Sequence, residues 1–159
     1  MGEYVRLSTK SRYGLRALFD IAYNAGSQPA QIKDISRRQE ISPRYLEQIF
    51  QSFKKAGILR SKKGPQGGYY LTRKPEQITL RQIIEAAEGD TLLVACACDA
   101  PKGKGRCTMN GQCVTQTVWS EATEHLNSFF DSMTLQTLCE RGQDLGVKRE
   151  SDHRFMYYI

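Results

Sequence analysis

The feature that most constrains the fold of this chain is a capped amphipathic helix followed at once by a segment that cannot be helical. Ser42 is a favoured N-cap residue, Pro43 suits the first helical position, and Gly57 suits the end of the helix. The helix carries one apolar stripe, formed by Leu46, Ile49, Phe50 and Phe53. Its opposite face is polar, with Arg44, Tyr45, Glu47, Gln48, Gln51 and Lys55.

Two short strands are expected directly after this helix. The segment KKGPQGG at 62–68 holds a proline and three glycines, which interrupt a helix. Residues 58–61 before it and 68–71 at its end have the character of an outgoing and a returning strand. We therefore expect a β-hairpin with a basic, glycine-rich tip.

Apolar spacing predicts the remaining elements. Helices are expected at 9–24, 31–40, about 80–87 (capped by Thr79) and 114–133, with a last helical turn or two at 134–141. The fold class is mainly α with a small β-hairpin wing. We expect a winged helix-turn-helix domain at 1–77, then a linker helix, a cysteine-rich loop and a long dimerisation helix at 78–141. Residues 142–159 are expected to form a weakly ordered tail.

The charge of the chain favours a polyanionic partner for its first half. Residues 1–75 carry a net charge of +10 and residues 76–159 carry −4, within a total of +6. A solvated basic surface is the alternative. The capped helix and basic hairpin supply a binding geometry, however, so the sequence predicts binding to a double-stranded DNA operator.

Three groups of residues are candidates for contact with DNA. The start of the capped helix would face base edges in the major groove, with Ser42, Arg44, Tyr45, Glu47 and Gln48. Glu47 would discriminate among bases rather than attract phosphate, or it is simply a charge on the helix surface. Phosphate contacts are expected from the hairpin tip and from the start of the first helix, through Lys62, Lys63, Gly64, Gln66, Thr9, Lys10 and Arg12.

Other functional classes are disfavoured. No apolar run approaches the roughly 20 residues that span a bilayer, and the first residues contain no apolar core of a secretory signal. We therefore expect a cytoplasmic, reduced protein that does not bind a membrane. Only two histidines are present, His125 and His153, and neither accompanies a nucleophile signature. An enzyme with a small-molecule substrate is the weakest hypothesis.

Four of the five cysteines lie between residues 96 and 113, in a loop rich in glycine and lysine. They are Cys96, Cys98, Cys107 and Cys113. In a reduced compartment clustered thiols more often bind metal than form disulfides. The spacings are loose for zinc and are tolerated by a 2Fe–2S cluster, which needs four mostly thiolate ligands. Zinc remains the alternative, and cysteines without a ligand are the weakest hypothesis.

The expected helix at 114–133 carries a second pattern. Its apolar positions step by four, four, three and four, as in a coiled-coil seam, and they are Val118, Ala122, Leu126, Phe129 and Met133. Packing of the same stripe against the chain's own core is an open alternative.

The chain resembles the IscR-type transcription regulators, which include a nitric-oxide sensor and a repressor of cysteine metabolism. The resemblance rests on RLSTKSRYGLRALFDIA, DISRRQEISPRYLEQIFQSFKKAGILRSKKGPQGGYYL and CTMNGQCVTQTVW, and it extends over about 6–139. It implies a homodimer with a winged-helix domain, a dimerisation helix and, in many members, an iron–sulfur cluster in the cysteine loop.

The resemblance also implies a set of ligands. Cys107 and Cys113 match two cysteines of the family, and the third ligand would be Cys96 or Cys98. Gln116 stands where IscR has a histidine, so it is a possible fourth ligand; alternatively all four cysteines bind the cluster. The expected function is regulation of transcription in response to iron–sulfur status. Sensing of nitric oxide or redox state, and a zinc-stabilised protein–protein adaptor, are the alternatives.

Overall fold

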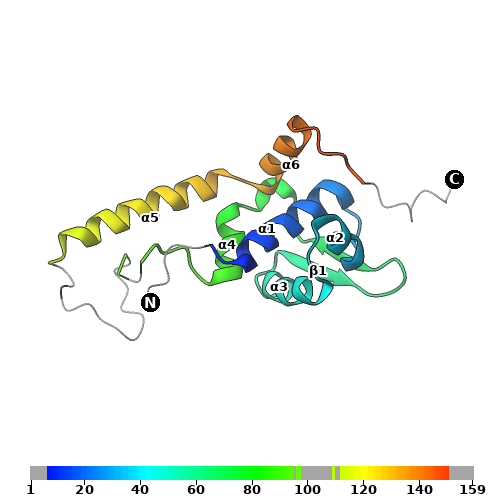
Figure 1. The fold of residues 1–159 in the computed structure, drawn as a ribbon, viewed down its shortest axis with the longest axis horizontal. Helices are drawn as coiled ribbons and strands as arrows, with labels where there is room; N and C mark the ends of the chain where they lie inside the picture. The colour runs from blue at the N-terminus through cyan, green and yellow to red at the C-terminus, as the bar shows by residue number, and fades with distance from the viewer. Residues whose placement is uncertain (1–6, 95, 98–108, 110–111, 151–159) are drawn as a thin grey trace.

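The computed structural model describes residues 7–94, 96–97, 109 and 112–150. Its elements follow the order helix, helix, helix, hairpin, helix, helix, helix (Figure 1). They are α1 Thr9–Asp20, the π-helical turn η1 Ile21–Ala25, α2 Ile32–Gln39, α3 Pro43–Lys55, β1 Leu59–Lys62, β2 Gly68–Leu71, the 3₁₀ turn η2 Pro75–Gln77, α4 Leu80–Glu88, α5 Val114–Ser132 and α6 Leu135–Asp144. The predicted fold class, mainly α with a β-hairpin wing, is confirmed.

The hairpin forms as its sequence predicts. β1 and β2 are antiparallel, and Leu59 lies opposite Leu71 while Lys62 lies opposite Gly68. Ala30, which precedes α2, adds a short third edge, since its N–H and carbonyl both bond to Tyr69 at 2.8 Å. A side chain at Gly68 would collide with the backbone of Ala30, so this glycine permits the close approach. The wing is thereby attached to the start of the helix-turn-helix.

The core lies between α1, α2, α3 and α4. The apolar stripe of α3 is fully buried, together with Leu18, Ile21, Ile35, Ile58 and Ile83. Gly14 of α1 packs on Phe53, and a Cβ there would lie 2.6 Å from the Phe53 ring. Without a side chain at Gly14, α1 and α3 come close together, and the polar face of α3 is directed outward.

A buried ion pair joins α1 to α2. Asp20 is fully buried and accepts hydrogen bonds from Arg38 Nε at 2.9 Å and Arg38 Nη2 at 2.6 Å. Gln39 donates to the same carboxylate at 2.9 Å and Asn24 at 3.2 Å. A buried charge is tolerated when it is paired and hydrogen-bonded in this way. The pair fixes the position of α2 against the end of α1.

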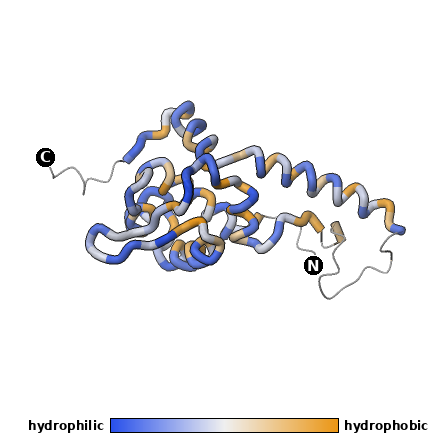
Figure 2. Tube along the Cα trace, turned by 180° about the vertical axis from the view of Figure 1, so that it is seen from behind, coloured by the Kyte–Doolittle hydropathy of each residue, from blue (hydrophilic) through white to orange (hydrophobic). Residues whose placement is uncertain are grey.

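α5 runs out from the rest of the molecule, as Figure 1 shows. In Figure 2 apolar residues recur along it although it lies outside the core. Among the described residues, no helix is both long and apolar enough to cross a membrane.

Two expectations about the second half differ from the structure. Met133 is 7 % exposed and follows α5 in an extended conformation, so it packs inside the chain and does not belong to an open seam. Residues 142–150 are not a weakly ordered tail, because α6 continues to Asp144 and the segment after it is attached to η1. Tyr23 Oη donates to the Val147 carbonyl at 2.7 Å. Residues 151–159 lie outside the described part, and the division of the chain at residue 77 stays a prediction.

The buried ion pair gives a test of the fold. Asp20→Ala leaves the side chain of Arg38, which is 12 % exposed, without its carboxylate, so we expect the free energy of unfolding to fall by about 3–5 kcal/mol. Urea denaturation followed by circular dichroism, at one fixed protein concentration, measures this. Arg37→Ala is the control, because Arg37 forms an exposed pair with Glu150. Equal losses in both variants would contradict the assignment.

Candidate nucleic-acid interface and cysteine segment

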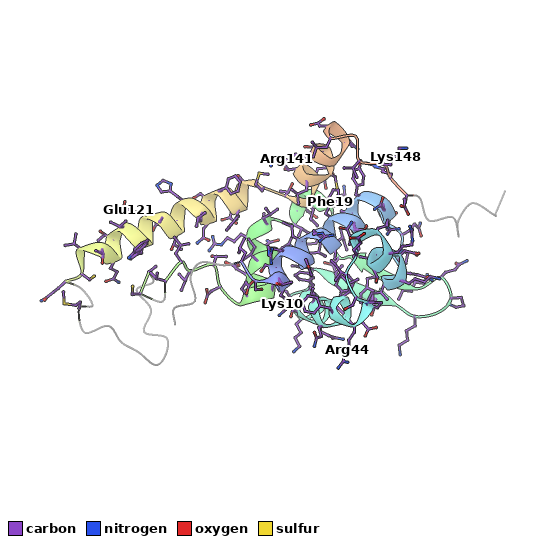
Figure 3. All side chains as sticks on the ribbon, viewed as in Figure 1. Lys10, Phe19, Arg44, Glu121, Arg141 and Lys148 are labelled. Atoms are coloured by element: carbon purple, nitrogen blue, oxygen red, sulfur yellow. The ribbon has the colours of Figure 1, made fainter. Side chains whose placement is uncertain are left out.

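The polar face of α3 is open to solvent. Ser42 caps the helix, with its Oγ accepting the Tyr45 N–H at 3.3 Å. Arg44, Glu47 and Gln48 are exposed, and Figure 3 shows Arg44 pointing away from the body of the protein. These three side chains can reach the edges of base pairs when α3 enters a major groove.

Tyr45 differs from its exposed neighbours. It is half-buried, and its ring meets the edge of Tyr13 on α1 with centroids 6.1 Å apart. Arg16 covers the Tyr13 ring, with its Cζ 5.4 Å from the centroid. Tyr45 therefore packs the start of α3 against α1, and it also lies at the candidate DNA interface.

The wing tip is fully accessible. Lys62, Lys63, Gly64 and Gln66 are all exposed. Gln31 holds the tip, with its side chain donating to the Pro65 carbonyl at 3.2 Å, and Lys54 holds strand β1 by donating to Ser61 at 3.3 Å. The lysines of the tip can therefore contact phosphates while the strands keep a fixed position beside α3.

Glu47 lies close to the wing strand β2. Partial burial raises the pKa of Tyr69, and the negative charge of Glu47 raises it further. The Tyr69 ring also packs on Phe50, at 4.7 Å between centroids. Glu47 is thus on the exposed face of α3 where the helix and the wing meet.

The start of α1 is occupied by the chain itself. Ser8 Oγ accepts the N–H groups of Lys10 at 3.2 Å and Ser11 at 3.5 Å. The Glu88 carboxylate accepts from the Ser8 N–H at 3.0 Å and from both serine hydroxyls. The amides of Lys10 and Ser11 therefore already have an acceptor within the chain. Phosphate contact by the side chains of Thr9, Lys10 and Arg12 stays a prediction.

Glu88 keeps its charge at this position. Partial burial raises its pKa, but hydrogen bonds from Ser11, the Ser8 hydroxyl and the Ser8 N–H, with the charge of Lys10, hold that pKa below its ordinary value overall. Sequence analysis did not find this residue. Ser8 could have been recognised as an N-cap, but nothing local to Glu88 indicates a partner 77 residues away.

We call residues 96–113 the cysteine segment. The structure describes two of its four candidate ligands. Cys96 is exposed, and Cys113 is the N-cap residue of α5. The Thr115 hydroxyl, 3.1 Å from Cys113 Sγ, and the Gln116 N–H lower the pKa of the Cys113 thiol. Gln116 is half-buried in the first turn of α5. Cys98 and Cys107 lie outside the described residues, and within the rest no three His, Cys, Asp or Glu side chains are grouped to hold a metal.

One polar face of α5 holds the segment that leads to the cysteines. Ser120 Oγ donates to the carbonyl of Ala97, between Cys96 and Cys98, at 3.0 Å. Thr91 donates to Asn127 at 2.5 Å. Asp131 pairs with Arg81 of α4 at 3.0 Å. Both the start and the end of the cysteine segment are therefore attached to this helix.

The apolar face of α5 lies roughly on the other side of the helix. Val118 is 55 % exposed and Phe129 is 52 % exposed. Ala122 and Leu126 are half-buried between them on the same face. These four residues, which we call the α5 apolar face, are incompletely covered by the chain.

Comparison with known proteins identifies the family. Residues 7–141 match the Rrf2 family, described as iron-dependent transcriptional regulators. This chain belongs to the Rrf2 family. The HTH-type transcriptional regulator IscR of Cronobacter sakazakii is 36 % identical over 143 residues, covering 90 % of this chain and 85 % of that protein. IscR of Aliivibrio salmonicida is 37 % identical over 134 residues, covering 84 % and 77 %.

Solved structures agree with this assignment. T. potens IscR matches with a TM-score of 0.71 and 32 % identity over 97 % of both chains. CymR of B. subtilis, described as the global cysteine regulator, matches with a TM-score of 0.70 and 28 % identity, over 86 % of this chain and 98 % of CymR. The resemblance drawn from the sequence is confirmed. This Rrf2 protein is an IscR-type, DNA-binding transcription regulator, and its relatives are named as regulators rather than enzymes.

Two substitutions test whether α3 reads bases while the wing contacts phosphates. Lys63→Ala should weaken binding to every sequence and reduce the slope of log K against log salt by up to about one. Gln48→Ala should instead lose about 1–3 kcal/mol of discrimination at one base position. Fluorescence anisotropy, on a duplex selected by the protein from a random library and on its point variants, measures both. Equal, sequence-independent losses from the two variants would show that α3 does not read bases.

Proposed function

We propose that this Rrf2 protein is a homodimeric regulator whose binding to operator DNA responds to a 2Fe–2S cluster held by the cysteine segment. The observation that carries the proposal is that α5 receives both ends of that segment. Cys113 begins the helix, and Ser120 holds the carbonyl next to Cys96. A ligand that joins the cysteines would thereby order a segment already anchored to one rigid element.

The described donors are compatible with such a cluster. Thiolates are the ligands that iron–sulfur clusters require, and the lowered pKa of Cys113 favours the thiolate. We assign Cys107, Cys113 and one of Cys96 and Cys98 as ligands, with Gln116 as the fourth. The amide oxygen of Gln116 is a weak, hard donor, so iron bound there would exchange readily. When bound, the cluster would make the protein responsive to its surroundings, because iron limitation and oxidants can remove it.

The residues of the chain carry out the recognition itself. Arg44, Glu47 and Gln48 would contact base edges, and Lys62 and Lys63 would neutralise phosphates on either side. A two-fold pair of such modules predicts an operator with two matching half-sites. The α5 apolar face supports the pair, because an incompletely covered helix face of this kind is typical of a subunit interface.

Iron and sulfide content tests the ligand assignment. Cys107→Ala and Cys113→Ala should each lose the cluster after anaerobic reconstitution, and only one of Cys96→Ala and Cys98→Ala should do so. Gln116→Ala should retain less iron, or release it faster, than the unchanged protein. Cys139→Ala is the matched control, because Cys139 is buried in α6. Full clusters in both Cys107→Ala and Cys113→Ala would refute the site, and bound zinc without sulfide would support the adaptor alternative.

Light scattering tests the proposed dimer. Val118→Asp and Leu126→Asp each put a charge on the α5 apolar face, where desolvation of a carboxylate opposes association. We expect monomers or insoluble protein from both. Ser128→Asp is the control, because Ser128 is exposed on α5 outside the apolar face. Fully dimeric protein from both test variants would place the subunit interface elsewhere.

A further inference from the structure

Glu88 connects the end of α4, which leads to the cysteines, to the start of α1 in the DNA-binding half. It ends α4, and one of its carboxylate oxygens accepts three hydrogen bonds from the start of α1. Ser11, one of the donors, is 2 % exposed. Hydrogen bonds to an ionised carboxylate are stronger than those between neutral groups. The contact therefore holds the end of α4 to the beginning of α1.

On one side of this contact the chain leads to the cysteines. Gly89 ends α4 with a φ of 100°, a conformation that favours glycine. Asp90 then accepts the Leu92 N–H at 3.1 Å, and Thr91 is bound to α5. Cys96 lies only eight residues beyond Glu88. Because the connection is short and Thr91 is bound to α5, a change in the position of this segment would displace Glu88.

On the other side α1 is packed tightly against the recognition helix. Tyr13, two residues beyond Ser11, meets Tyr45 at the start of α3 edge to face. Gly14 leaves no room for even a methyl group against Phe53. Because packed interiors do not deform continuously, a shift at the start of α1 would be passed on to the start of α3.

We propose that Glu88 is a positioning residue that couples the state of the cysteine segment to the recognition helix through the hydroxyls of Ser8 and Ser11. The inference rests on the proposed function and adds the contact through which it would be regulated. Coupling between two ligands is reciprocal and is measured as a ratio of affinities. The expected quantity is therefore the Kd for DNA of the iron-free protein divided by that of the cluster-loaded protein.

The experiment uses the full chain and a duplex selected from a random library by the cluster-loaded protein. Anisotropy titrations on both forms should give a ratio that differs from one by roughly 5–150-fold in the unchanged protein, the usual range of coupling. Glu88→Ala should bring the ratio to within about twofold of one. Ser11→Ala should move it in the same direction while leaving the Ser8 cap intact. Iron and sulfide per chain and the melting temperature are measured for each variant.

Glu85→Ala is the matched control. Glu85 is one turn earlier on α4 and pairs with Arg81 instead of α1, so the ratio should stay at its original value. If Glu88→Ala does not fold, Ser11→Ala and Glu88→Gln decide the question. An unchanged ratio in the folded variants, an equal loss in Glu85→Ala, or complete loss of iron from Glu88→Ala would each overturn the inference. If the unchanged protein binds no cluster, or binds DNA equally with and without it, the proposed function itself fails.

Discussion

The position of the recognition helix depends on a carboxylate that water does not reach. Asp20 is fully buried at the end of α1, where Arg38, Gln39 and Asn24 all donate hydrogen bonds to its carboxylate. A charge in such a site admits few arrangements of its neighbours, whereas apolar packing alone admits many. α2 is held in one orientation against α1, and the short turn at Ile41 then presents α3 with its apolar stripe inward. Every candidate base contact on α3 follows from that orientation.

Local signals predicted the elements of the fold well. The Ser42 cap, the stripe of α3 and the glycines of the hairpin each act within a few residues, so a short window of sequence reveals them. Met133 shows where such reasoning fails. Helical spacing places it on the α5 stripe, but the chain leaves the helix at Ser132, and Thr134 then pairs with Thr79. A contact 55 residues away decides the end of that helix, and no local pattern encodes it.

The candidate sites were predicted unevenly for the same reason. Arg44, Glu47, Gln48 and the wing lysines are exposed as expected, because their positions follow from one helix and one hairpin. The contact of Glu88 with the start of α1 was missed, because its partners Ser8 and Ser11 lie 80 and 77 residues away in the sequence.

α5 has two faces with different chemistry. Its polar face bonds to the chain that carries Cys96, while its apolar face is incompletely covered. A helix is stiff over its length, so neither face can move without the other. If the apolar face is the subunit interface proposed above, the spacing of two recognition helices along DNA is set by the same rigid body that anchors the cysteines. Ordering of the cysteine segment could then act on DNA binding in two ways, through the tilt of α5 and through the end of α4. The first would change the distance between half-sites, and the second would change the contacts within each one.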